Sequence, residues 1–182
     1  MNPPDRHPRP SGQRLFFALW PAATLQSRIF NYAQSLKISS ARFVPVDNLH
    51  MTLLFLGQVE TGQQCCLEQA LNSLRLPGFE LHFGQAVFRR RQRLLWLEPA
   101  STPDALLRLV AALRQIASDC GLKTESRPFL AHISLFHKLA QAPPDLPAPE
   151  FIWPVQDFAL VASKTLPAGA RYRIVKKWSL AG

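Results

Sequence analysis

The same short pattern occurs twice in this chain of 182 residues, each time within an apolar stretch. The first copy, LHMTLLFLG, contains His50 and Thr52, and the second, FLAHISLF, contains His132 and Ser134. Both stretches have the composition of β-strands, in which residues two apart point to the same face. Each strand therefore presents a histidine beside a hydroxyl, while the residues on its other face pack on a core.

One copy of this pattern carries little information, because H-x-[S/T] arises by chance in many chains of this length. A lone histidine near a strand end is most simply explained as a residue hydrogen-bonded to the backbone. Two copies in matched strands, each after an extended segment that contains proline, favour a shared role. They predict two quasi-symmetric halves whose central strands face one another across a cleft.

The remaining hydrophobic periodicity predicts an α+β fold, in which helices connect groups of strands. We predict helices over Ala22–Leu36, Thr61–Leu76 and Pro103–Cys120. Besides Leu49–Gly57 and Phe129–Phe136, the predicted strands are Arg14–Trp20, Phe79–Phe88, Leu94–Glu98, Val155–Ser163 and Arg171–Ser179, with an extended segment at Arg42–Val46. We expect a flexible tail over residues 1–13. Residues 14–182 are expected to form one bilobal domain, with two quasi-symmetric lobes of antiparallel strands and flanking helices around a central cleft.

Charge and cysteine usage limit the class of protein. The formal net charge of +9 favours polyanionic partners such as nucleic acid, although a basic surface also serves solubility. No apolar run approaches the roughly 20 residues that cross a bilayer, and the N-terminus lacks the apolar segment of a secretory signal. Cys65, Cys66 and Cys120 have neither metal-binding spacing nor an even-numbered disulfide framework. We therefore expect a protein of the reducing cytoplasm without membrane contact. We also expect a monomer.

Two histidines and two hydroxyls around one cleft suit the chemistry of a phosphodiester. Imidazole exchanges protons near neutral pH, so one histidine can activate water while the other protonates the leaving oxygen. The hydroxyls can donate hydrogen bonds to the non-bridging oxygens. A metal site would add a third ligand, often a carboxylate, and neither histidine strand contains an acidic residue. Ser134 lacks the G-x-S-x-G turn of a serine nucleophile. We therefore predict no metal and no cofactor.

At these residues the sequence resembles the 2H phosphoesterases, which are defined by two H-x-[T/S]-x motifs, here HMTL and HISL. Within them it is similar to the bacterial RNA 2′,3′-cyclic phosphodiesterases, also called 2′–5′ RNA ligases. The similarity lies in RLFFALWP, VPVDNLHMTLLFLG, RLLWLEP, SRPFLAHISL and RYRIVKKWSL, and it covers nearly everything from Arg14 to Leu180.

This resemblance implies metal-independent hydrolysis of a terminal RNA 2′,3′-cyclic phosphate to a 2′-phosphomonoester, with reversible 2′–5′ ligation as a further activity. It implies that His50 is the proton donor and His132 the proton acceptor, and that Thr52 and Ser134 bind the phosphate oxygens. The expected partner is RNA with a 2′,3′-cyclic phosphate end, or a cyclic nucleotide.

The chain departs from the family at one position. Members often carry an arginine three residues after the second hydroxyl, where this chain has His137, followed by Lys138. These two residues are candidates for the phosphate contact, although lysine lacks the bidentate fork of arginine. Phe17 is a candidate platform for the terminal base. It neighbours Phe16 on a strand, so at most one of the two faces the cleft, and both can instead be core residues.

Two alternative functions stay open at the level of sequence: a non-catalytic RNA-binding module with a basic cleft, and a phosphodiesterase for a small cyclic nucleotide or nucleotide-sugar phosphate. The basic run RRRQR at residues 89–93 fits a solvated hairpin turn or a track for an RNA backbone. Trp96, Trp153 and Trp178 are expected in the core or between the lobes.

Overall fold

The structure is a computed structural model that describes residues 12–38, 41–125, 127–167 and 169–180. Within these residues the chain forms nine β-strands, three α-helices and one 3-10 helix. In chain order they are β1 (Gln13–Leu19), α1 (Ala23–Ser35), β2 (Arg42–Phe43), η1 (Val46–Asn48), β3 (Met51–Val59), α2 (Thr61–Asn72), β4 (Phe79–Arg89), β5 (Leu94–Pro99), α3 (Asp104–Asp119), β6 (Ile133–His137), β7 (Phe151–Val155), β8 (Asp157–Leu166) and β9 (Gly169–Ser179).

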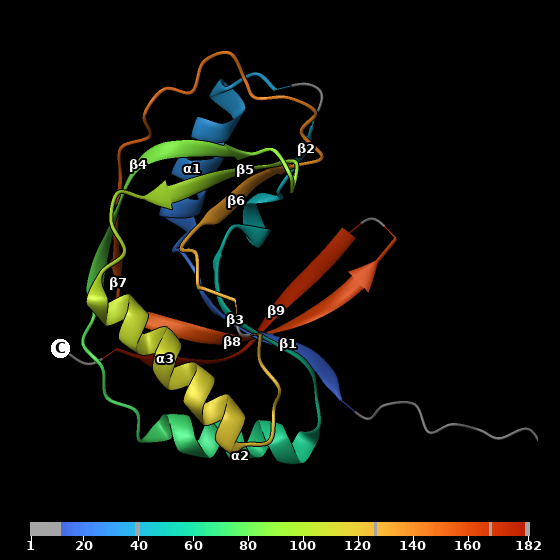
Figure 1. Cartoon of the computed structure of the whole chain (residues 1–182), viewed down its shortest axis with the longest axis vertical. Helices are drawn as coiled ribbons and strands as arrows, with labels where there is room; N and C mark the ends of the chain where they lie inside the picture. The colour runs from blue at the N-terminus through green and yellow to red at the C-terminus, as the bar shows by residue number, and fades with distance from the viewer. Residues whose placement is uncertain (1–11, 39–40, 126, 168, 181–182) are drawn as a thin grey trace, which may run out of the picture.

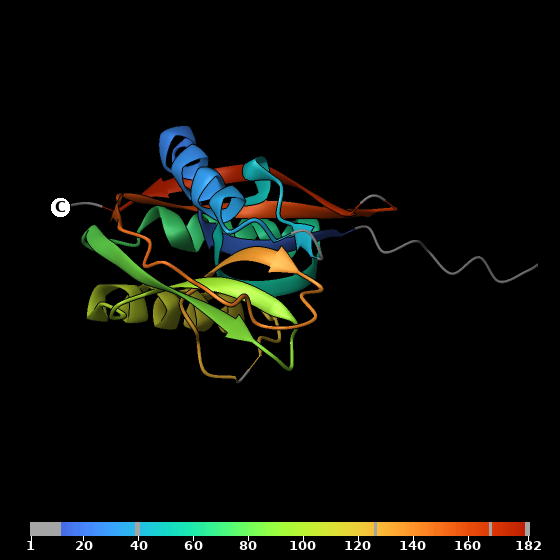
Figure 2. The same ribbon diagram turned by 90° about the horizontal axis from the view of Figure 1, so that it is seen from above.

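The strands form two antiparallel sheets, each of which holds one copy of the histidine pattern. The four-stranded sheet has the order β3-β1-β8-β9, and the five-stranded sheet has the order β2-β6-β5-β4-β7. In Figure 1 the five-stranded sheet lies above the four-stranded one, and α2 and α3 lie at the lower end of the molecule. From above, α1 lies on one side of the chain and α3 on the other, with most of the strands between them (Figure 2). The predicted α+β fold with two sheet-containing lobes is confirmed.

Strand alternation divides the apolar residues of β1 between two clusters. Leu15, Phe17 and Leu19 belong to the main core, which extends through both sheets and all three helices. Phe16 lies on the opposite face of β1, in a small second cluster. The prediction that Phe17 lies at the cleft is wrong, because this side chain is fully buried against Phe158 and Trp178.

Several predicted boundaries shift for local reasons. Both histidines precede their strands by one residue, since β3 begins at Met51 and β6 at Ile133. The predicted strand over residues 129–132 is absent, and Pro128 precedes it without an N–H to donate. Helix α2 ends four residues before the predicted end, ahead of Pro77, which disfavours helical conformation in the residue before it.

Strand β7 was not predicted, because its proline and the proline-rich segment before it resemble a loop. Among the described residues it pairs only with β4 and therefore forms an edge of the five-stranded sheet. An edge strand tolerates proline, because it needs N–H groups for pairing on one side only. Near the N-terminus, the tail predicted over residues 1–13 overlaps β1, which begins at Gln13. Residues 1–11 of the predicted tail lie outside the described residues.

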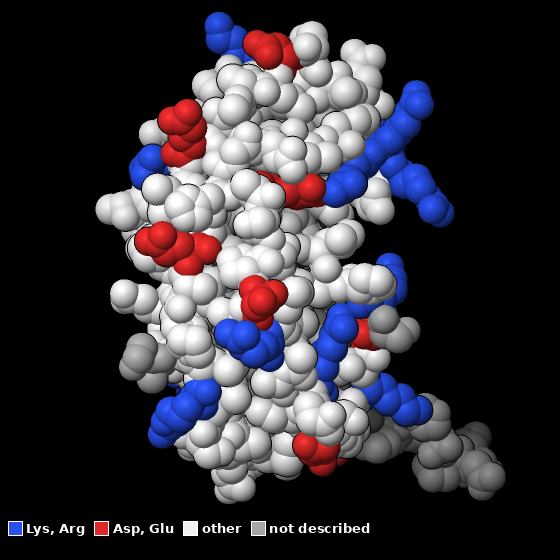
Figure 3. Space-filling model, turned by 60° about the vertical axis from the view of Figure 1, so that its left-hand side comes forward, with Lys and Arg blue, Asp and Glu red and all other residues white. Residues whose placement is uncertain are grey.

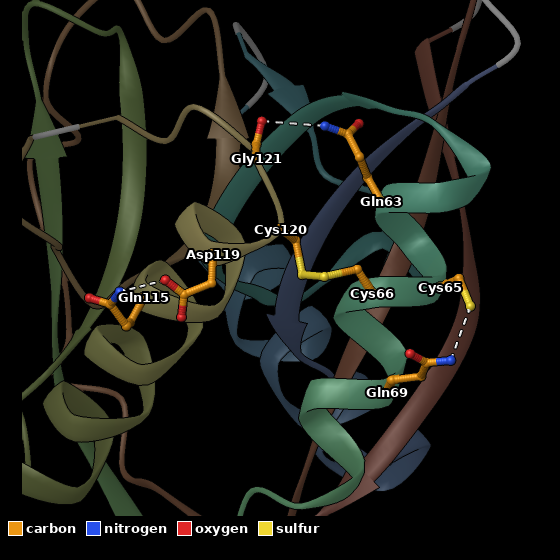
Figure 4. The surroundings of a disulfide bond; sticks show 8 residues. All are labelled: Gln63, Cys65, Cys66, Gln69, Gln115, Asp119, Cys120 and Gly121. Atoms are coloured by element: carbon orange, nitrogen blue, oxygen red, sulfur yellow. Dashed lines mark hydrogen bonds between the residues drawn. A yellow bond between two sulfur atoms is a disulfide. The ribbon is translucent and has the colours of Figure 1, made fainter.

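The expectation that the cysteines form no disulfide is wrong. Cys66 of α2 and Cys120, directly after α3, are joined by a disulfide bond, and Cys65 is a free, exposed thiol (Figure 4). The pairing depends on how α2 packs against α3, which no cysteine spacing reveals. The inference of a reducing compartment from the cysteine count therefore loses its basis. None of the described helices is long and apolar enough to cross a membrane.

Candidate active site

The four residues of the repeated pattern lie on one pocket between the two sheets. Thr52 lies on β3 of the four-stranded sheet and Ser134 on β6 of the five-stranded sheet, and each histidine directly precedes its strand. The pocket has a volume of about 590 Å³. Two segments far apart in the sequence thus bring two imidazoles and two hydroxyls to the same solvent-accessible space.

Each histidine is anchored in the same way at one edge of its ring. Nδ1 of His50 lies 2.6 Å from the carbonyl oxygen of Asn48, and Nδ1 of His132 lies 2.8 Å from that of Leu130. A carbonyl oxygen only accepts hydrogen bonds, so each Nδ1 carries the proton and donates it. Nε2 of each neutral imidazole is therefore left with a lone pair.

The two Nε2 atoms differ in their partners. Nε2 of His50 lies 3.1 Å from Oγ1 of Thr52, so the hydroxyl donates to this lone pair. Among the described residues, Nε2 of His132 has no hydrogen-bond partner. The lone pair of His132 is thus open to a proton from a bound molecule, whereas that of His50 is already occupied.

Burial keeps both imidazoles neutral in the free protein. It lowers the pKa of His50 to about 4, against the opposing hydrogen bond to Asn48, and the nearby His132 lowers this pKa further. Burial also lowers the pKa of His132, which the hydrogen bond to Leu130 and the carboxylate of Glu98 raise in part. An anion bound between the two rings favours their protonated forms and raises both pKa values.

Aromatic rings surround both histidines. His50 lies 5.2 Å from the ring centre of Phe16, 5.1 Å from that of Tyr172 and 5.1 Å from that of Trp20. His132 stacks on Trp96, with ring centres 3.8 Å apart. No sequence pattern distinguishes Trp20 or Trp96 from core tryptophans, because their partners come from other strands.

One side of the pocket is basic. His137 and Lys138 line it, together with Arg42, Gln92 and Arg93. Burial lowers the pKa of His137, and the charge of Arg42 lowers it further. Most of the Lys and Arg side chains visible in Figure 3 lie along the right-hand edge of that view.

The basic run at residues 89–93 divides into three environments. Arg89 forms an ion pair with Glu98, Arg93 lines the pocket, and Arg90 and Arg91 are exposed in the hairpin turn. The run is therefore a solvated turn at its centre and a pocket wall at its end. Among the described residues, no group of three or more His, Cys, Asp or Glu side chains is placed to hold a metal ion.

Comparisons with known proteins give similarities that all point to one family. The 2′-5′ RNA ligase superfamily matches residues 25–165. The RNA 2′,3′-cyclic phosphodiesterase of Escherichia coli (strain K12) is 35% identical over 171 residues, which is 92% of this chain and 97% of the relative. The protein of the same name from Thermus thermophilus is 32% identical over 157 residues, 76% of this chain and 75% of the relative. Escherichia coli LigT complexed with 3′-AMP superposes with a TM-score of 0.86 at 33% identity, covering 94% of this chain and 99% of that one.

Proposed function

The chain belongs to the 2′-5′ RNA ligase superfamily, the 2H phosphoesterases, and we propose that it hydrolyses the 2′,3′-cyclic phosphate at the end of an RNA. It is a hydrolase of the RNA 2′,3′-cyclic phosphodiesterase type. The observation that carries the proposal is the pairing of His50 and His132 on one pocket, each beside a hydroxyl. The expected monomeric state and cytoplasmic location remain predictions.

In the proposed reaction, a water molecule attacks the phosphorus of the cyclic phosphate. Nε2 of His132 accepts a proton from this water as the new P–O bond forms. The bond between phosphorus and the 3′ oxygen breaks, and Nε2 of His50 donates a proton to that oxygen. The products are a 2′-phosphomonoester and a free 3′-hydroxyl. In 2′–5′ ligation the 5′-hydroxyl of a second RNA would take the place of water: His132 would accept its proton, a bond between phosphorus and the 5′ oxygen would form, and the 3′ oxygen would again leave with a proton from His50. The two histidines would exchange roles when the 2′–5′ bond is cleaved.

The hydrogen bonds of the free protein favour this assignment of roles. The unoccupied lone pair of His132 suits a proton acceptor, while the lone pair of His50 already accepts from Thr52. The low pKa of His50 makes its protonated form scarce in the free protein. Substrate binding is expected to make the protonated form of His50 more abundant, because the negative phosphate beside the ring stabilises the imidazolium.

The remaining pocket residues match the charge of the substrate. Thr52 and Ser134 would donate to the non-bridging phosphate oxygens, and His137 and Lys138 would take the place of the arginine that members of the family often carry. Arg42 and Arg93 extend the basic side of the pocket toward the RNA backbone.

The position of the phosphate on the product tests the proposed function. An oligoribonucleotide with a 2′,3′-cyclic phosphate end is expected to give a 2′-phosphate, identified by ³¹P NMR, at the same rate with and without EDTA. A 3′-phosphate product would contradict the assigned bond cleavage, and loss on chelation would indicate a metal enzyme. Salt-sensitive RNA binding without turnover would favour the RNA-binding module. Turnover of 2′,3′-cyclic AMP but not of the oligonucleotide would favour a small cyclic nucleotide as substrate.

The pH dependence is expected to differ between kcat/KM and kcat. The profile of kcat/KM reports the free enzyme, and burial places the pKa values of both histidines below the ordinary 6.5. Both limbs of this bell-shaped profile are therefore expected below pH 6.5. The profile of kcat reports the bound state, where the phosphate raises both pKa values, so its bell lies at higher pH. Steady-state rates between pH 3 and 9 check this, and two coincident bells would contradict it.

A further inference from the structure

Each histidine of the repeated pattern stacks on one tryptophan, and the two stacks come from different sheets. The ring of His132 is inclined by 19° to that of Trp96 in β5, at a centre-to-centre distance of 3.8 Å. The ring of His50 is inclined by 5° to that of Trp20, which follows β1, at 5.1 Å. The arrangement is thus repeated around the pocket, although nothing in the H-x-[S/T] pattern requires it.

The stacks restrict the one motion that the backbone hydrogen bonds leave free. The bond from Nδ1 to a carbonyl oxygen holds one edge of each ring, and Thr52 also contacts Nε2 of His50, but a ring held only by hydrogen bonds in its own plane can still tilt about them. An indole against the face of the ring removes this freedom. Edge and face contacts together fix the direction in which Nε2 presents its proton or lone pair.

Trp96 is held in place at some cost to the fold. Its side chain is 7% exposed, and Nε1 is buried without a hydrogen-bond partner. An unpaired buried donor is destabilising, so a purely apolar residue would serve the core better at this position. The guanidinium of Arg89 lies over the same indole, 5.2 Å from the ring centre, and pairs with Glu98. The indole is therefore packed between charged and imidazole groups rather than within the aliphatic core.

We propose that Trp96 and Trp20 are positioning residues, which hold the ring planes of His132 and His50 so that each Nε2 stays directed at the reacting phosphate. Neither indole takes part in the chemistry. The inference rests on the proposed function for its effect on rate, while its effect on the histidines themselves is independent of any substrate.

The charged and titratable groups around the two rings set the sign of the expected changes. Arg89 on β4 lowers the pKa of His132 and Glu98 on β5 raises it, and the two charges are paired with each other. His50 faces His132 across the pocket, and Tyr172 of β9 lies beside His50. Removal of the indole of Trp96 leaves these charges in place and admits water to His132. Its pKa then rises toward the ordinary value, because burial is the main cause of the shift.

The test compares Trp96→Leu with a matched variant, Trp153→Leu. Trp153 is also buried in the five-stranded sheet, at 6% exposure, but lies on β7, whereas Trp96 lies on β5 and stacks on His132. Trp96→Leu is expected to lower kcat by about 10- to 100-fold with little change in KM, as for a misdirected catalytic group. The pKa of His132, measured by NMR titration of its imidazole without substrate, is expected to move upward. Trp153→Leu is expected to lower the melting temperature and leave kcat and the pKa of His132 unchanged.

A second variant covers the case in which Trp96→Leu does not fold. Trp96→Phe keeps an aromatic face of smaller area, and it is expected to produce the same two changes at reduced size. Unchanged kcat and unchanged imidazole pKa in the folded Trp96 variants would overturn the proposal, as would equal changes in Trp153→Leu. Since the NMR titration requires no turnover, a failure of the proposed function would leave this readout intact.

Discussion

Replacing either His50 or His132 with alanine is expected to lower kcat for opening of an RNA 2′,3′-cyclic phosphate by roughly a thousandfold, as expected when a general acid or base is lost. Both residues lie on the same pocket and both are anchored through Nδ1, so each substitution removes one of the two imidazoles that the proposed proton transfers use. A matched control is His82→Ala, since His82 is an exposed histidine of β4 beside Glu80, outside the pocket. The measurement is kcat of the three variants on one cyclic phosphate substrate, and His82→Ala is expected to match the wild type. Circular dichroism spectra check that all three variants are folded.

An activated substrate separates the proton donor from the acceptor. A p-nitrophenyl phosphodiester has a leaving group that departs as a stable anion and needs no proton. His50→Ala is therefore expected to recover most of the wild-type rate on this ester, whereas His132→Ala stays impaired because the water still needs a base. Recovery in His132→Ala but not in His50→Ala would reverse the two roles. Equal impairment of both variants on both substrates would count against division into one acid and one base.

The repeated pattern predicts the overall arrangement because it is a property of strands. A histidine and a hydroxyl two residues apart on a strand point to the same face, and two such strands that serve one site are expected to face one another across a cleft. The structure has one copy beside β3 and one beside β6, in different sheets. The same alternation places Phe16 and Phe17 on opposite faces of β1. Only the tertiary packing shows that Phe17 is on the face of the main core.

What the sequence leaves undetermined depends on contacts between distant segments. Trp96 meets His132 because β5 pairs with β6, and Cys66 meets Cys120 because α2 packs on α3. Neither pairing changes the local hydrophobic pattern from which helices and strands are predicted. For strand β7 the local pattern itself is misleading. Pro154 makes the segment resemble a loop, but at the edge of a sheet a proline does not prevent strand pairing.

Removing the two hydroxyls tests how the site holds the phosphate. Thr52→Val and Ser134→Ala each remove one donor to the oxygens that gain negative charge, and each is expected to lower kcat by about 10²-fold. The donor-preserving variants Thr52→Ser and Ser134→Thr are the matched controls and are expected to stay within a few-fold of wild type. Loss of activity in these controls equal to that in Thr52→Val and Ser134→Ala would show that packing, rather than the hydroxyl, is what matters.

The two hydroxyl variants are further expected to differ in pH dependence, because only one of the hydroxyls contacts a histidine. Oγ1 of Thr52 donates to Nε2 of His50 and so stabilises the neutral ring. Thr52→Val is therefore expected to raise the pKa of His50 and move the corresponding limb of the kcat/KM profile to higher pH. Ser134 has no such bond to His132 among the described residues, so Ser134→Ala lowers the rate without moving the profile. Equal shifts in both variants would show that the bond between Thr52 and His50 does not control the protonation of His50.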